Sequence, residues 1–226
     1  MTNNLRTRLD IISEKIEFAC KKANRERSSV RLVAVTKTHS VETIQTLIDL
    51  GVKDIGENRV AEIIKKAPFL HGDYTLHMIG HLQTNKVTPI LPYIKWVQSI
   101  DRERLISRIE YLYSGTEKIK ALIEINTSGE QSKSGCKPEE CRDLCERVLQ
   151  SKSLELQGFM TIGPLGNDEL STRRAFSLLR EISEKNSDLI KTPELSMGMS
   201  GDFEWAIDEG STMVRIGTLL LGEQDR

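Results

Sequence analysis

RLVAVTKT, residues 31–38, sets the fold class. The apolar run between Arg31 and Lys37 predicts a buried β-strand. An amphipathic helix is expected at residues 41–50, with Ser40 as its N-cap and Gly51 at its end. The segment therefore predicts a strand, a short loop and a helix in that order.

The same alternation repeats along the chain, which favours a parallel sheet with helical connections. Further strands are expected at residues 54–57, 75–79, 96–100, 118–125, 156–162, 194–197 and 213–216. Further helices are expected at residues 60–66, 84–91, 102–113, 138–150, 169–185 and 202–209. One more amphipathic helix, residues 5–23, precedes the first strand.

The absence of a Pro/Gly/Ser-rich linker between the eight strands predicts one domain over residues 1–226. The predicted fold of this domain is a closed α/β barrel of the (β/α)8 TIM type with an extra N-terminal helix. An open doubly wound sheet is the alternative. The sequence lacks the GxGxxG motif that would open a dinucleotide-binding sheet of that kind.

Charge and composition favour a small ligand over a polymer. Thirty-two basic residues nearly balance thirty-three acidic ones, and no basic block is interleaved with aromatic residues. We therefore expect neither a nucleic-acid groove nor binding to a membrane surface.

The chain is expected to be cytoplasmic. Its N-terminus lacks the apolar stretch of a signal peptide, and no apolar run reaches the roughly 18 residues of a membrane span. Four cysteines without a CxxC pair predict free thiols and no metal site; they are Cys20, Cys136, Cys141 and Cys145.

Lys37 is the first candidate functional residue, because ligands of such barrels bind at the carboxyl ends of the strands. A lysine that follows a buried strand should lose solvation, which would lower its pKa and free the amine to form a Schiff base with an aldehyde. A solvated lysine, or one paired with Glu57, is the alternative.

Two segments near the C-terminus fit a phosphate group. Ser200 and Gly201 directly precede a predicted helix, whose free N–H groups favour an anion. Gly217 and Thr218, after the last strand, offer a close backbone approach and a hydroxyl donor. Two ordinary glycine turns with a serine N-cap are the alternative.

Arg215 lies among apolar residues of the last strand, where a guanidinium needs a partner. It would donate a hydrogen bond to an unprotonated pyridine nitrogen of a ligand. Pairing with a carboxylate such as Glu57 explains the residue equally well.

Several motifs together resemble the pyridoxal phosphate homeostasis protein family, whose members are barrels of the alanine racemase type. In order along nearly the whole chain, the motifs are VAVTKTH, GENRV, HMIGHLQTNK, SKSG, GFMTIG and SMGMSGDFEWAIDEGSTMVRIGT. The resemblance implies pyridoxal 5'-phosphate (PLP) as cofactor, a Schiff base on Lys37, Asn58 beside the cofactor and Arg215 at the pyridine nitrogen. It also implies a phosphate site made of Ser200, Gly201, Gly217 and Thr218.

Other polar residues of these motifs are weaker candidates. An ordinary surface position explains His81 and Lys86 equally well, and Phe203 and Trp205 are interpreted as packing residues. Lys133, in the loop after the fifth strand, is either a second aldehyde acceptor or an ordinary solvated lysine.

Three functions are compatible with these residues. The resemblance implies a PLP carrier in PLP homeostasis, without robust catalysis and with PLP-dependent apoenzymes as potential recipients. A PLP-dependent amino-acid racemase is the alternative, but in related racemases the second acid/base group comes from an additional C-terminal domain, and this chain ends at Arg226. A phosphate-binding barrel without PLP would leave Lys37 unexplained.

Overall fold

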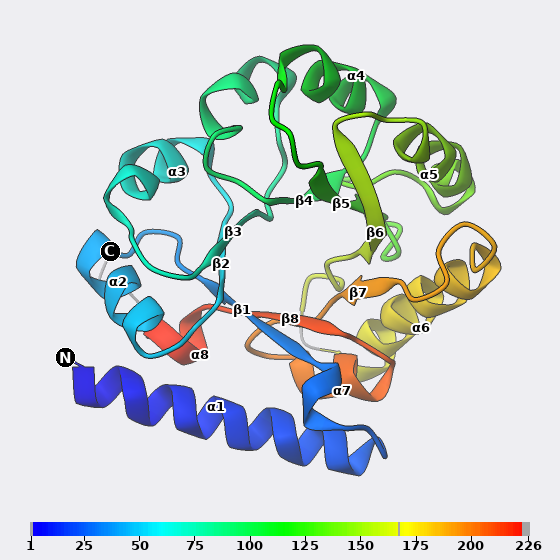
Figure 1. Ribbon diagram of the computed structural model, residues 1–226. Coiled ribbons are helices and arrows are strands. Elements are labelled where there is room, and N and C mark those ends of the chain that lie inside the picture. The colour runs from blue at the N-terminus through cyan, green and yellow to red at the C-terminus, as the bar shows by residue number, and fades with distance from the viewer. Residues whose placement is uncertain (1, 167, 223–226) are drawn as a thin grey trace.

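Strand pairing closes the sheet into a ring, as Figure 1 shows for the computed structural model of residues 2–166 and 168–222. All neighbouring strands are parallel, and β8 returns to pair with β1. The strands are β1 (Arg31–Val35), β2 (Asp54–Glu57), β3 (Thr75–Met78), β4 (Trp96–Ile100), β5 (Ile119–Glu124), β6 (Leu154–Met160), β7 (Glu194–Ser196) and β8 (Met213–Ile216). The predicted TIM-type barrel is confirmed.

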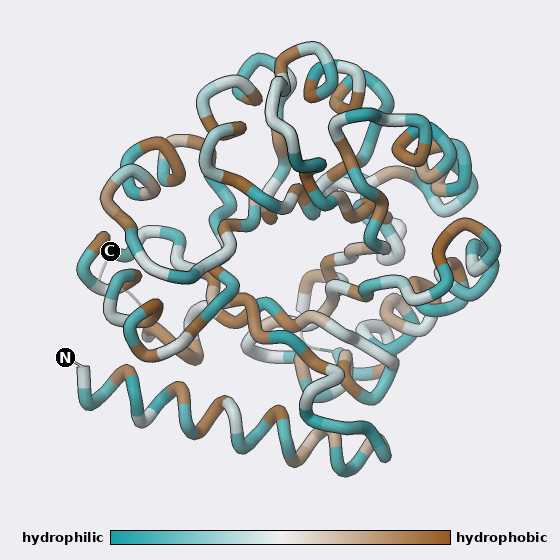
Figure 2. Tube along the Cα trace, in the orientation of Figure 1, coloured by the Kyte–Doolittle hydropathy of each residue, from teal (hydrophilic) through white to brown (hydrophobic). Residues whose placement is uncertain are grey.

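Helices surround the ring and present their apolar faces to it (Figures 1 and 2). The helices are α2 (Val41–Asp49), α3 (Val60–Lys66), α4 (Glu103–Leu112), α5 (Cys141–Leu149), α6 (Glu169–Lys185), α7 (Phe203–Asp208) and α8 (Thr218–Leu221). The predicted extra N-terminal helix is α1 (Thr2–Lys22), which packs against α7 and α8. None of the helices that the structure describes is long and apolar enough to cross a membrane.

Local signals explain where helix α2 begins and ends. The Ser40 hydroxyl accepts a hydrogen bond from the Thr43 amide at 3.3 Å, so Ser40 is the N-cap that the sequence predicted. Gly51 follows the helix with φ +94°, a conformation that a residue without Cβ adopts without strain.

The helix predicted at residues 84–91 is wrong. Two 3-10 turns occupy this stretch instead, η3 (Thr84–Lys86) and η4 (Thr88–Ile90). Pro89 lies in the second turn, where its missing N–H and its ring prevent a continuous α-helix. Three more 3-10 turns are η1 (Arg27–Ser29), η2 (Ala67–Phe69) and η5 (Pro138–Glu140), and helix α8 was not predicted.

Side chains from opposite sides of the ring meet inside the barrel. Five of them form a separate apolar cluster: Val33, Trp96, Leu122, Met160 and Met213. Strand β1 lies across the ring from β5, and β8 lies across it from β4, so side chains of these strands can meet only in the interior. The larger apolar core lies between the strands and the helices.

His77 is fully buried beside this apolar cluster. The ring of His77 stacks on Trp96 with centroids 5.2 Å apart. Its Nδ1 lies 2.9 Å from Gln98 Nε2, which only donates, so Nδ1 accepts and Nε2 donates to Asp54 Oδ1 at 2.9 Å. Burial lowers the pKa of His77, so the ring is neutral in the folded protein.

We predict that His77→Gln reduces the dependence of stability on pH. Because the folded pKa of His77 is lowered, its neutral ring contributes stability that is present above the unfolded pKa of about 6.5 and is lost as pH falls. The free energy of unfolding, measured with urea, should therefore be larger for the wild type than for His77→Gln. This difference should shrink as the pH is lowered from about 8 to about 5. The decrease approaches about 2 kcal/mol if the ring stays neutral throughout.

His71→Gln serves as the control, since His71 is exposed. It should leave the pH profile unchanged. A margin between wild type and His77→Gln that stays constant with pH would contradict the neutral buried ring.

Candidate functional site

Ring closure brings the predicted site residues to one rim of the barrel, because parallel strands all end on the same side. Val33 of β1 lies opposite Arg215 of β8, and Ala34 lies opposite Ile216. The chain that leaves β1 therefore runs beside the chain that leaves β8. A Cβ on Gly217 would lie only 3.3 Å from the Val35 carbonyl oxygen, which shows how closely these two segments pack.

Lys37 lies beyond the first strand rather than within it. Strand β1 ends at Val35, and residues 36–38 form a turn in which Thr38 has φ +68°. The Lys37 side chain is exposed, so the expected burial of this lysine is wrong. The apolar run of residues 32–35 predicted the strand, but the change of backbone direction after Thr36 was not visible in it.

Glu57 is not the partner of Lys37 or of Arg215. This buried carboxylate accepts hydrogen bonds from Lys66 Nζ at 2.9 Å and from Thr36 Oγ1 at 2.8 Å. Lys66 also donates to the Thr36 carbonyl at 3.0 Å. The alternative pairings of Glu57 with Lys37 and with Arg215 are therefore wrong. Instead, the contacts among Thr36, Glu57 and Lys66 anchor the start of the turn that carries Lys37.

Arg215 is buried, with 4% of its surface exposed, and its guanidinium is held by neutral groups. Nη1 donates to Ser196 Oγ at 2.7 Å, and Nη2 donates to the Thr161 carbonyl at 2.8 Å. Ser196 in turn donates to Gln98 Oε1 at 2.7 Å, and Gln98 is the partner of His77. A continuous chain of hydrogen bonds therefore links Arg215 to the barrel interior.

The charge of Arg215 is only partly compensated. Burial lowers its pKa to about 10, while the carboxylates of Asp202 and Glu124 act in the opposite direction. None of the ion pairs between described residues includes Arg215. The guanidinium stays protonated at neutral pH and has a fixed orientation.

The two predicted phosphate segments lie side by side. Ser200 Oγ accepts a hydrogen bond from the Leu219 amide at 3.2 Å, which ties the loop before α7 to the start of α8. Gly217 is the N-cap of α8 and Thr218 is its first residue. Gly201 and Thr218 are exposed, and Ser200 is half-buried. Both segments therefore present backbone and hydroxyl groups at one place on the rim.

Asn58 directly follows β2 and is half-buried. Its Oδ1 is buried and has no hydrogen-bond partner among the described residues, which is costly for a polar atom. Gly80 packs against it, since a Cβ on Gly80 would lie 2.3 Å from the Asn58 carbonyl oxygen. An unpaired acceptor beside a close-packed backbone fits a polar ligand that supplies the missing donor. These residues fit PLP.

The weaker candidates have ordinary partners. His81 Nδ1 lies 3.2 Å from Asp101 Oδ2, and Lys86 is exposed in η3. Lys133 Nζ donates to the Gly163 carbonyl. Phe203 is buried and Trp205 is half-buried, in agreement with packing roles. No group of His, Cys, Asp or Glu within residues 2–166 and 168–222 is arranged to hold a metal ion.

Sequence reasoning missed Glu124, the last residue of β5. It is 4% exposed, and no described residue donates a hydrogen bond to its Oε2. Burial and the Asp101 carboxylate raise its pKa to about 7, against the influence of Arg215 and Arg102. A glutamate that closes the apolar run of IKALIE was the signal for it in the sequence.

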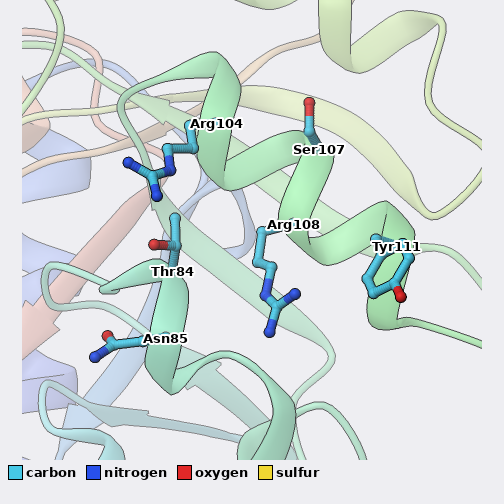
Figure 3. Close-up of a pocket in the computed structure, with 6 residues that line it drawn as sticks. All are labelled: Thr84, Asn85, Arg104, Ser107, Arg108 and Tyr111. Atoms are coloured by element: carbon cyan, nitrogen blue, oxygen red, sulfur yellow. The ribbon is translucent and has the colours of Figure 1, made fainter.

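The size of a cavity alone does not identify the candidate site. A groove of about 450 Å³ lies outside the barrel between η3 and α4, where Figure 3 shows Arg104, Arg108 and Tyr111 on the helix facing Thr84 and Asn85. None of the predicted site residues lines it. The candidate site therefore rests on the convergence of strand ends.

Comparisons with known proteins agree with this architecture. The family model of the alanine racemase N-terminal domain matches residues 8–225. A pyridoxal phosphate homeostasis protein of Aquifex aeolicus is 39% identical over 221 residues, which are 96% of this chain and 97% of that protein.

Solved structures have the same barrel. PipY of Synechococcus elongatus, solved with PLP bound, is 30% identical and has a TM-score of 0.77 over 93% of this chain and 100% of its own. An alanine racemase of Clostridium difficile, 17% identical with a TM-score of 0.78, shares the fold over 99% of this chain and 58% of its own. By sequence and by structure, the chain belongs to the family of pyridoxal phosphate homeostasis proteins, built on the barrel of the alanine racemase N-terminal domain.

Proposed function

We propose that this protein holds PLP as a Schiff base on Lys37 and takes part in intracellular PLP homeostasis without robust catalysis. The observation that carries the proposal is the β1–β8 pairing, which sets the Lys37 turn beside Gly217 and Thr218. The names of the relatives and the PLP bound to PipY support it. Residues 1–226 would act as one PLP-binding barrel domain.

Lys37 is accessible to an incoming aldehyde because its side chain is exposed at the rim. PLP supplies an aldehyde: the ε-amine adds to the carbonyl carbon, a C=N bond forms and one water molecule leaves. The turn that carries Lys37 is held by the Thr36, Glu57 and Lys66 contacts, so the amine starts from a fixed backbone position.

The joined loops would bind the phosphate. Ser200 and Thr218 offer hydroxyl donors, and Gly201 and Gly217 allow the backbone to approach the anion closely. Asn58 would lie along the edge of the cofactor, where its unpaired Oδ1 needs a donor. The three strands that these residues follow, β2, β7 and β8, all end on one rim.

Arg215 would face the pyridine nitrogen and donate a hydrogen bond to it. An arginine that stays protonated keeps that nitrogen neutral, and a neutral ring is a poorer electron sink for carbanion chemistry. A fixed guanidinium of this kind suits a protein that retains PLP and equally a racemase, so Arg215 does not distinguish the two functions.

PLP-dependent apoenzymes would receive the cofactor in this role. All four cysteines are buried and free, which fits the reducing cytoplasm in which we propose that the protein acts.

We predict that the protein purified with PLP has a visible absorbance band from the Schiff base. Borohydride reduction followed by peptide mass mapping should place the label on Lys37. A label found mainly on Lys133 would contradict the assignment of the lysine.

The double variant Ser200→Ala with Thr218→Val should retain PLP less tightly. Each change removes a hydroxyl donor worth about 1 kcal/mol, so the dissociation constant should rise about thirtyfold. Equilibrium dialysis measures it, with Ser107→Ala, an exposed position on α4, as the control. An unchanged constant in the double variant would move the phosphate site elsewhere.

Catalysis on amino acids should be slow compared with typical enzymes, which turn over about 10 times per second. A racemase needs acid/base groups on both faces of the α-carbon, and Lys37 serves one face. Incubation of the PLP-loaded protein with L-amino acids in deuterated water, followed by NMR and chiral analysis, tests this. Rapid exchange with inversion, abolished by Lys37→Ala, would replace the carrier by a racemase.

A further inference from the structure

A second cavity lies on the same rim as the proposed PLP site. It encloses about 230 Å³ between the ends of β3, β5 and β6. None of the residues proposed to bind PLP lines it, but it shares Gly80, which packs against the Asn58 backbone. The cavity therefore adjoins the PLP site and has a lining of its own.

Glu124 supplies an unmet hydrogen-bond acceptor in the wall of this cavity. Glu124 has only 4% of its surface exposed, and its Oε2 has no hydrogen-bond partner among the described residues. A buried carboxylate without a donor is costly, whereas a ligand ammonium group would satisfy it.

Two other polar side chains of the wall, those of Asn126 and His81, are already engaged. Asn126 Nδ2 donates to the Glu130 carbonyl at 2.9 Å, and Asn126 Oδ1 accepts from Ser128 Oγ and from the Gly129 amide, each at 3.0 Å. His81 is paired with Asp101. Among the buried side chains that line the cavity in the described part of the chain, Glu124 is thus the one with an unpaired polar atom.

Lys133 provides the opposite charge. Its ammonium group donates to the Gly163 carbonyl, and two of its three hydrogens have no described acceptor. The cavity therefore presents a carboxyl group and an ammonium group together. This arrangement is complementary to a zwitterion.

Apolar side chains form the remaining wall, and two of them are unusually exposed. Ile162 has 36% of its surface exposed and Leu165 has 78%. The volume corresponds to roughly eight water molecules at about 30 Å³ each, which suits a ligand the size of a free amino acid.

We propose that this cavity binds a free α-amino acid with an aliphatic side chain. The ammonium group of the amino acid donates a hydrogen bond to Glu124, and its carboxylate accepts one from Lys133. The aliphatic side chain of the amino acid covers Ile162 and Leu165. This inference goes beyond the proposed function, since the contacts do not involve PLP.

Isothermal titration of the borohydride-reduced protein with L-leucine tests the inference, because reduction removes the aldehyde and leaves only non-covalent binding. Leucine should bind, and Glu124→Gln and Lys133→Met should each weaken binding about tenfold or more, the loss of one charge-assisted hydrogen bond. Glu155→Gln, an exposed position on β6, is the matched control and should bind like the wild type.

Two truncated probes separate the contacts. Glu124→Gln should weaken 3-methylbutylamine and leave 4-methylpentanoate unchanged, and Lys133→Met should do the reverse. Absence of leucine binding, or binding that neither variant affects, would overturn the inference. The PLP absorbance band, measured on the same protein before reduction, tests the proposed function separately. If the band is absent but leucine still binds, the result contradicts only the proposed PLP site.

Discussion

Hydrogen bonding between β1 and β8 is the constraint on which this molecule depends. It closes the ring, so that segments far apart in the sequence, around Lys37 and around Thr218, become neighbours on one rim. An open sheet would leave β1 and β8 on separate edges and the candidate site in two halves. The close approach of Gly217 to the Val35 carbonyl shows that the two segments still pack tightly one residue after β8 ends.

The barrel interior determines how rigid that rim is. A chain of buried hydrogen bonds runs from Asp54 through His77, Gln98 and Ser196 to Arg215. Each link is a polar group that would be costly to leave unpaired, so the chain stabilises the fold and fixes the guanidinium together. Stability and cofactor binding are therefore expected to depend on the same interior residues.

The periodicity of the sequence predicted the eight strands, the outer helices and the extra N-terminal helix, because apolar spacing reports directly on burial. The periodicity did not predict the two 3-10 turns around Pro89 or the exposure of Lys37, since both depend on local backbone geometry. Glu57–Lys66 pairing and the contacts of Arg215 arise from neighbours across strands and helices, which no linear pattern specifies. Glu124 closes an apolar run in the sequence, but the absence of a described donor to its Oε2 depends on such neighbours as well.

A crystal structure of the protein with PLP tests the central claim most directly, because it locates all parts of the cofactor at once. The account predicts continuous density from Lys37 Nζ to the cofactor, the phosphate between residues 200–201 and 217–218, and the pyridine nitrogen at Arg215. Density joined to Lys133, or a phosphate bound away from the two loops, would contradict it.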